Sequence, residues 1–363
     1  MQQPKIQNAS TSFSTFDPRY FSQIKATSAP ITDAWRQWIA INKYAGMDDH
    51  LIVQQLITNG ISPSAAKLEV SSLNQNPYFQ SGHKFVQALR KLESHANILA
   101  DLASLSSHSH TIERRPTISR TDFLENHYAK NIPLILTDIT KNWSALSQWN
   151  PEYLKNKYGQ VEIEVQSDRD SDRLYEIDIE KHRKKMQMAD YADAVMAGGA
   201  TNNYYMVANN GNIEKTALGK LLDDIEIFPE YLDPQNTKGT TFFWFGPAGT
   251  ITPLHHDPVN LMFVQVYGRK VWKIIPPYYT HMLYNYRGVF SEVDCENPDY
   301  EKYPAFQKVP IIEVTLNPGD TIFIPVGWWH TVKSLDVSIS MSFTNFVFPN
   351  QYEWIYPAIA NEA

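Results

Sequence analysis

The sequence predicts a mainly β protein, a closed or double-sheet jelly roll, preceded by an all-helical region. From residue 117 onward, short runs rich in branched and aromatic residues follow one another, separated by Pro, Gly, Asn and Asp, as in β-sandwiches and barrels. Between residues 31 and 105, apolar residues instead recur at three- and four-residue intervals, which indicates helices. A chain of 363 residues, 43% hydrophobic and 20% charged, has the size and composition for this two-part globular architecture.

The helical region carries the residues that begin and end helices. Thr32 is placed to cap a first helix, Gly60 to end a second, and Ser62 followed by Pro63 to begin a third. A longer helix is expected to reach about residue 105. The expected domains are an arm at 1–30, the helices at 31–105, a linker at 106–116, the β domain at 117–350 and a C-terminal tail at 351–363.

Charge and cysteine content limit the partners and the compartment. The formal net charge of −7 argues against a general nucleic-acid binder, because such proteins need a basic face. The one cysteine, Cys295, cannot form an intramolecular disulfide, which favours a reducing compartment. The sequence contains no apolar run of membrane-spanning length, and its polar first residues lead us to expect no secretory leader. We therefore expect a cytoplasmic protein without a membrane partner.

The stretch SDRDSDRLYEIDIEKHRKKM, residues 167–186, carries charges of both signs. Such a run is most often a solvated loop. The alternative is a lid over a polar substrate.

The stretch TPLHHDP, residues 252–258, raises the question of a metal site. Alternate residues of a strand share a face, so His255 and Asp257 can point into one cavity while His256 points away. A third ligand is available in NPGDTIFIPVGWWH, where Gly327 permits a bend that turns His330 inward. Two histidines and one carboxylate on one face of an octahedron suit a non-haem Fe(II) that activates O2.

A His-x-Asp pair taken alone is common by chance, so the motif needs its context. His256 is expected to be a packed or surface histidine. The histidines at 127, 182 and 281 have no partner at ligand spacing.

Two blocks supply that context: FFWFGPAGTITPLHHDPVNLMFVQVYGRKVWKIIPP and, about fifty residues later, LNPGDTIFIPVGWWHTVKSLDVSISMSF. Together they resemble the JmjC-type, cupin-like 2-oxoglutarate oxygenases, and among them the arginyl and asparaginyl hydroxylases, over roughly residues 117–348. The resemblance implies a double-stranded β-helix fold. It also implies Fe(II) as the metal, with 2-oxoglutarate and O2 as cosubstrates.

The resemblance assigns roles residue by residue. It makes His255, Asp257 and His330 the iron ligands and the catalytic centre, and it makes Lys270 the cation for the far carboxylate of 2-oxoglutarate. Thr252 and Tyr205 are expected to bind that carboxylate too, with Tyr204 as the alternative. The relatives often carry Asn four residues after the aspartate, whereas this chain has Leu261 there and Asn260 one residue earlier. A bulge would turn the Asn260 side chain into the cavity, toward the cosubstrate.

For the substrate, the resemblance suggests a guanidinium pocket formed by Glu164 and Trp244, because a carboxylate and an indole together can bind that group. The alternative is a rim charge and a core tryptophan. The expected reaction is hydroxylation of a side chain in a protein or peptide, with arginine as the suggested target, yielding succinate and CO2.

Other functions remain open at this point. They are oxygenation of a small molecule or an RNA base, demethylation of methyl-lysine, and a catalytically silent cupin used as a scaffold. The N-terminal helices could brace the barrel, recognise the substrate or form a homodimer.

Overall fold

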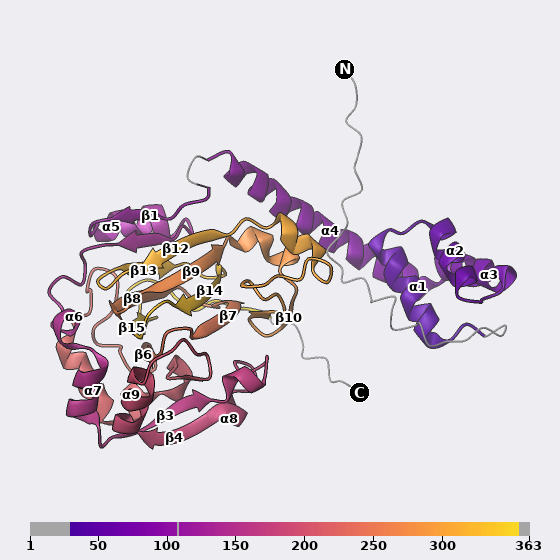
Figure 1. Ribbon diagram of the computed structural model, residues 1–363. Helices are drawn as coiled ribbons and strands as arrows, with labels where there is room; N and C mark the ends of the chain where they lie inside the picture. Colours follow the sequence, from indigo (N-terminus) through magenta and orange to yellow (C-terminus); the bar gives the residue numbers. More distant parts are fainter. Residues whose placement is uncertain (1–29, 107–108, 356–363) are drawn as a thin grey trace. The chain divides into compact units, whose positions relative to one another are not determined.

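The chain divides into two compact units. The computed structural model describes residues 30–106 and 109–355 (Figure 1). One unit holds the N-terminal helices with residues 300–307, and the other holds residues 104–299 and 308–363. Nearly all of the arm expected at 1–30 lies outside the described residues, as do residues 356–363 of the expected tail.

The helical unit contains α1 (Asp33–Ala45), α2 (Asp49–Thr58), α3 (Pro63–Gln75) and α4 (Pro77–Ser104). The expected caps are confirmed: the side chains of Thr32 and Ser62 accept hydrogen bonds from the backbones of Trp35 and Ala65. Gly60, just beyond α2, has a φ of 86°, which a glycine adopts without strain. The first three helices close their own small core, formed by Trp35, Trp38, Ile39, Ile52, Leu56, Ile61, Ala66 and Val70.

Two six-stranded sheets form the larger unit and confirm the expected β architecture. The first sheet has the order β1 (Glu113–Arg115), β2 (Leu134–Leu136), β13 (Thr321–Ile324), β8 (Leu261–Tyr267), β15 (Ser338–Phe343) and β6 (Thr241–Gly246). The second has the order β10 (Asn285–Arg287), β11 (Phe290–Ser291), β7 (Ile251–His256), β14 (Trp329–Ser334), β9 (Lys270–Ile275) and β12 (Ile312–Leu316). Neighbouring strands are antiparallel except β1 and β2.

A third, smaller sheet has the order β4 (Arg183–Gln187), β3 (Glu162–Ser167) and β5 (Tyr204–Tyr205). The short α-helices of this unit are α5 (Arg120–Phe123), α6 (Ala145–Gln148), α7 (Pro151–Tyr158), α8 (Ile179–His182), α9 (Met188–Met196) and α10 (Asn212–Lys215). A π-helical turn covers Leu124–Tyr128, and 3₁₀ turns cover Arg169–Ser171, Ala208–Asn210, Ala217–Asp224, Pro277–Met282 and Pro304–Lys308.

The alternation of side chains along β15 shows what each face of the first sheet contacts. Ile339, Met341 and Phe343 join the core that helices α7 and α9 complete. Ser338, Ser340 and Ser342 point to the opposite face, yet all three are buried. That face is the interior between the two large sheets, where a second core joins residues such as Phe263 and Trp272. The barrel interior is therefore apolar but lined by hydroxyls on one wall.

Two segments are more ordered than the sequence suggested. The charged run, expected to be a solvated loop, contains a 3₁₀ turn, α8 and β4. Strand β1 lies inside the range expected to be a linker and pairs with β2. Both strands are edge strands with mostly exposed side chains, so they lack the apolar alternation that marks a half-buried strand. Within the described residues, no helix is long and apolar enough to span a bilayer.

Candidate metal centre and cosubstrate pocket

Strands β7 and β14 bring the three candidate metal ligands together. The two strands are antiparallel, with His330 directly opposite His255. Asp257 follows the end of β7, and its carbonyl accepts a hydrogen bond from the Gly327 amide, which ties the two chain segments together. Gly327 has a φ of 80°, so the bend expected there is present. One potential ligand atom from each of the three side chains lies within 4.8 Å of the others.

Both imidazoles are oriented as metal ligands require. His255 Nδ1 lies 2.8 Å from the Pro253 carbonyl oxygen, and His330 Nδ1 lies 3.0 Å from that of Trp328. A carbonyl oxygen only accepts hydrogen bonds, so Nδ1 must carry the proton and Nε2 is left with a free lone pair. His330 Nε2 lies 3.7 Å from the Asp257 carboxylate.

Electrostatics also favour a cation at this position. Burial lowers the pKa of His330 well below its usual value, so its imidazole is neutral at neutral pH. Partial burial raises the pKa of the Asp257 carboxyl, because the charged form loses part of its hydration. A divalent cation would stabilise that carboxylate and needs neutral imidazoles, so the donor set fits a 2-His-1-carboxylate metal.

The candidate cosubstrate cation, Lys270, begins the strand after the β8–β9 turn, as expected. Gly268 in that turn has a φ of 69°, and a Cβ there would collide with the Val337 carbonyl. Lys270 is 1% exposed, and its ammonium lies near the rings of Phe263, Tyr205 and Trp244. Burial lowers its pKa to about 7.

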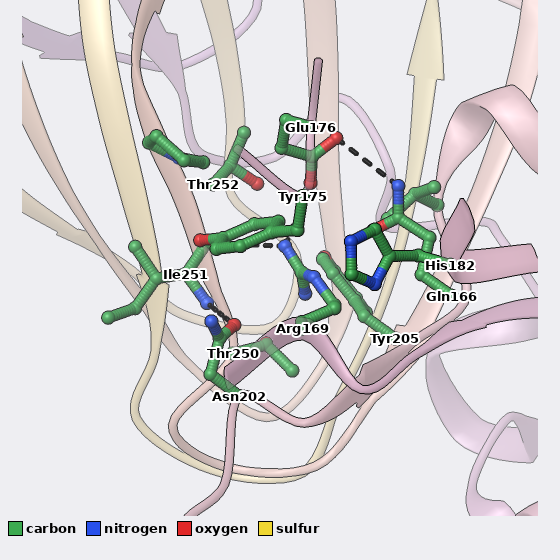
Figure 2. Close-up of polar contacts among 12 residues, drawn as sticks. Gln166, Arg169, Tyr175, Glu176, His182, Asn202, Tyr205, Thr250, Ile251 and Thr252 are labelled. Carbon is green, nitrogen blue, oxygen red and sulfur yellow. Dashed lines mark hydrogen bonds and ion pairs between the residues drawn. The ribbon is translucent and has the colours of Figure 1, made fainter. Parts of the chain in front are cut away.

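Of the two tyrosines considered, Tyr205 is the one at the lysine. Its hydroxyl accepts a 2.7 Å hydrogen bond from the Lys270 ammonium. The Tyr204 hydroxyl instead donates to the Ala194 carbonyl. Thr252 lies on β7, directly after Ile251, and Figure 2 shows it near Tyr175 and Glu176. A register irregularity between β7 and β14 pairs Val332 with Thr252, so Pro253 and Leu254 of β7 together lie opposite the single residue Thr331 of β14. Such a bulge changes the side-chain alternation between Thr252 and His255.

The Asn260 side chain binds the C-terminal segment and the turn after β13. Its amide nitrogen donates to the side chains of Asn350 and Tyr352, and its amide oxygen accepts from the Val326 backbone. Leu261, in contrast, packs with the interior cluster that contains Trp244 and Phe263. The residue on the interior side is therefore the leucine, and both N–H groups of the Asn260 side chain, the donors that a carboxylate would need, already have acceptors.

The two residues expected to bind substrate lie in different surroundings. The Glu164 carboxylate, on β3, pairs with the Arg183 guanidinium and accepts from the Asn210 amide. Nearby Arg183 and Asn209 line a surface cavity of about 530 Å³, together with residues 177–181. Trp244 instead lies in the barrel interior, where its indole donates to Ser342.

His256, expected to be packed or on the surface, is packed. It is 1% exposed and lies between the rings of Trp329 and Trp354, with centroids 4.6 and 4.5 Å away.

The burial of one side chain in the charged run was not predicted from the sequence. Arg169, in the charged run, is 1% exposed and lies between the rings of Tyr175 and Tyr205 (Figure 2). Nothing in the local pattern distinguishes it from its solvated neighbours, such as Arg173. The hint available in the sequence was the pair Leu174-Tyr175, which is too apolar for a fully solvated run.

Comparison with known proteins agrees with this geometry. The cupin-like domain profile matches residues 120–348. Lysine-specific demethylase 8 of Danio rerio is 34% identical over 235 residues, 62% of this chain and 54% of its own length. Lysine-specific demethylase JMJ30 of Arabidopsis thaliana is 30% identical over 247 residues, 64% of this chain and 54% of its own.

HSPB1-associated protein 1 of Rattus norvegicus is 44% identical over 134 residues, 33% of this chain and 28% of its own length. The chain thus spans about half the length of each of the first two relatives and 28% of the length of the third. The matched profile covers more than half of this chain and includes every candidate ligand. The chain therefore belongs to the cupin-like family, of the JmjC type, whose members use Fe(II) and 2-oxoglutarate.

Proposed function

We propose that this chain is an Fe(II)- and 2-oxoglutarate-dependent oxygenase that hydroxylates a side chain of a protein or peptide. The observation that carries the proposal is the convergence of His255, Asp257 and His330, with both Nδ1 atoms held by carbonyls and both Nε2 atoms free to bind a metal. Bound Fe(II) would supply the activation of O2, with 2-oxoglutarate as the reductant that leaves as succinate and CO2.

The protein's own contribution is orientation and exclusion of water. The Lys270 ammonium, Tyr205 hydroxyl and Thr252 hydroxyl would hold the far carboxylate of 2-oxoglutarate. Lys270 and Tyr205 are already joined by a hydrogen bond and almost fully buried, so the carboxylate would find a preformed, dry site. In such a site a charge-assisted hydrogen bond is stronger than in water. Trp244 would form a wall of this same pocket, since it lies 5.9 Å from the lysine ammonium.

We propose a protein or peptide substrate that binds along β3 and the charged run. Glu164 supports an arginine as the target, because its carboxylate already holds one guanidinium, that of Arg183. A substrate arginine would take the place of Arg183, and the adjoining cavity of about 530 Å³ would accommodate the displaced side chain or the peptide.

Demethylation of methyl-lysine is a second candidate, favoured by the names of the two demethylase relatives. Both reactions begin with hydroxylation of a C–H bond. They differ in whether the hydroxyl remains on the product or a methyl group is lost.

A mass-spectrometric experiment tests the proposal and separates the two reactions. Protein extract is incubated with Fe(II), 2-oxoglutarate and either the wild-type chain or His330→Ala. The proposal expects succinate formation and peptides heavier by 16 Da with the wild-type chain alone. Loss of 14 Da from lysine peptides would favour demethylation, and equal succinate from both proteins would contradict the proposed function.

A further inference from the structure

The buried guanidinium of Arg169 joins the charged run to the candidate cosubstrate pocket. Its Nη2 donates 2.8 Å hydrogen bonds to the Glu176 carboxylate and to the Ile251 carbonyl. Its plane packs against two rings, 4.2 Å from the Tyr175 centroid and 5.2 Å from that of Tyr205 (Figure 2). Among the described residues, its Nε and Nη1 have no hydrogen-bond partner.

Burial of this guanidinium has a cost in free energy that calls for an explanation. Removing a guanidinium from water has a large desolvation penalty, which one ion pair repays only in part. An arginine in this place is therefore expected to fix something that a smaller apolar side chain would not.

What Arg169 fixes is visible from its two contacts in the barrel unit. Ile251 directly precedes Thr252, and its carbonyl also accepts a 3.0 Å hydrogen bond from the Tyr175 hydroxyl. Tyr205 is the residue whose hydroxyl accepts from Lys270. Arg169 thus contacts the ring of Tyr205 and the backbone directly before Thr252, and both residues are proposed to hold the far carboxylate.

The rest of the segment reinforces this arrangement. Gln166, fully buried on β3, pairs in register with Tyr205, and its amide donates to the second oxygen of Glu176. Asn202, beside β5, accepts from the Ile251 amide. The segment from Gln166 to Glu176 is in this way bonded to both β5 and the start of β7.

We propose that Arg169 is a positioning residue for the cosubstrate, a statement that rests on the proposed function. Through its stacking on Tyr205 and its bond to the Ile251 carbonyl, the guanidinium sets the position of the Tyr205 hydroxyl and of Thr252. It therefore controls how tightly the far carboxylate of 2-oxoglutarate is held. The charged run then forms a structural wall of the cosubstrate pocket.

The test compares two ligands that differ at the far carboxylate. The protein is loaded with Mn(II), and the dissociation constants of 2-oxoglutarate and of 2-oxobutyrate are measured by water-proton relaxation. 2-Oxobutyrate keeps the 2-oxo acid end but lacks the second carboxylate. The variants are Arg169→Met and, as a matched control, Arg173→Met, which removes an exposed arginine from the same segment.

For Arg169→Met we expect the dissociation constant of 2-oxoglutarate to rise at least tenfold, while those of Mn(II) and 2-oxobutyrate stay within twofold of wild type. Arg173→Met should leave all three within twofold. A rise of less than tenfold for 2-oxoglutarate, or an equal loss for both oxo acids, overturns the positioning role.

If Arg169→Met does not fold, Glu176→Gln removes the partner charge with little change of shape, and the same criteria apply to it. The two proposals fail in different ways. A wild-type protein that does not bind 2-oxoglutarate contradicts the proposed function itself, whereas normal binding by both wild type and Arg169→Met contradicts only the role of Arg169.

Discussion

The Lys270 ammonium donates a 2.7 Å hydrogen bond to the Tyr205 hydroxyl, and the two side chains are 1% and 2% exposed. The acceptor of that bond is a neutral hydroxyl, and aromatic rings surround the charge. A buried ammonium in such a place is most stable when an anion joins it. The pair therefore has the properties expected of a site that is completed by a carboxylate ligand.

Replacement of Lys270 by Met should weaken 2-oxoglutarate binding by about 10- to 100-fold, since a charge-assisted hydrogen bond contributes roughly 1.5–3 kcal/mol. Titration of Mn(II)-loaded protein measures this. Mn(II) affinity should be unchanged, because the metal ligands are untouched. Unaltered 2-oxoglutarate affinity in Lys270→Met would remove this lysine from the cosubstrate site.

The pH dependence of 2-oxoglutarate binding should follow Lys270. Burial lowers the pKa of this lysine to about 7, so in the free protein the ammonium form dominates only below that pH. A bound dicarboxylate favours the charged form, hence binding above pH 7 requires uptake of a proton. Affinity should then fall by up to about tenfold per pH unit above 7.

Calorimetry in two buffers of different ionisation enthalpy checks this prediction. At pH 8 it should record uptake of close to one proton per 2-oxoglutarate bound. Lys270→Met should abolish the uptake. A pH-independent affinity between 6.5 and 8.5 in the wild-type protein would show that the lysine remains charged throughout.

Glu164→Ala should reduce hydroxylation of the protein substrate at least tenfold if an arginine is the target, because the ion pair to its guanidinium is lost. Glu162→Ala is the matched control, since Glu162 lies two residues earlier on the same face of β3 and pairs with the exposed Lys185. Mass spectrometry of the modified peptide measures both. Unchanged turnover in Glu164→Ala, when His255→Ala abolishes it, would refute the guanidinium pocket.

Asn260→Ala should destabilise the fold rather than the cosubstrate complex. The substitution removes bonds to Asn350 and Tyr352 and leaves the Val326 amide without its acceptor. Each such loss costs roughly 1–3 kcal/mol, so thermal unfolding should occur at a clearly lower temperature. A folded variant with normal stability and a tenfold weaker affinity for 2-oxoglutarate would instead favour a direct cosubstrate role.

The sequence was sufficient for the features that depend on local rules. Helix caps such as Thr32, the bend at Gly327 and the strand around His255 follow from side-chain type and periodicity, and the structure has them. The Gly327 bend made His330 a candidate, and the resemblance assigned its role and that of Lys270; the structure brings His330 to within ligand spacing of His255 and Asp257.

What the sequence could not supply depends on tertiary contacts. Arg169 has the same charged neighbours as any solvated arginine, and its burial is decided by rings 6 and 36 residues away, those of Tyr175 and Tyr205. The amide of Asn260 is similarly committed by Asn350, ninety residues later. Edge strands β1 and β4 have no apolar alternation, so hydrophobic periodicity did not predict them.

A crystal structure of the protein with Mn(II) and N-oxalylglycine, an analogue of 2-oxoglutarate, tests the central claim most directly. We expect one Mn(II) bound by the Nε2 atoms of His255 and His330 and by the Asp257 carboxylate, with the far carboxylate of the analogue on Lys270. A metal bound elsewhere, or an analogue that does not contact both the metal and Lys270, would contradict this account.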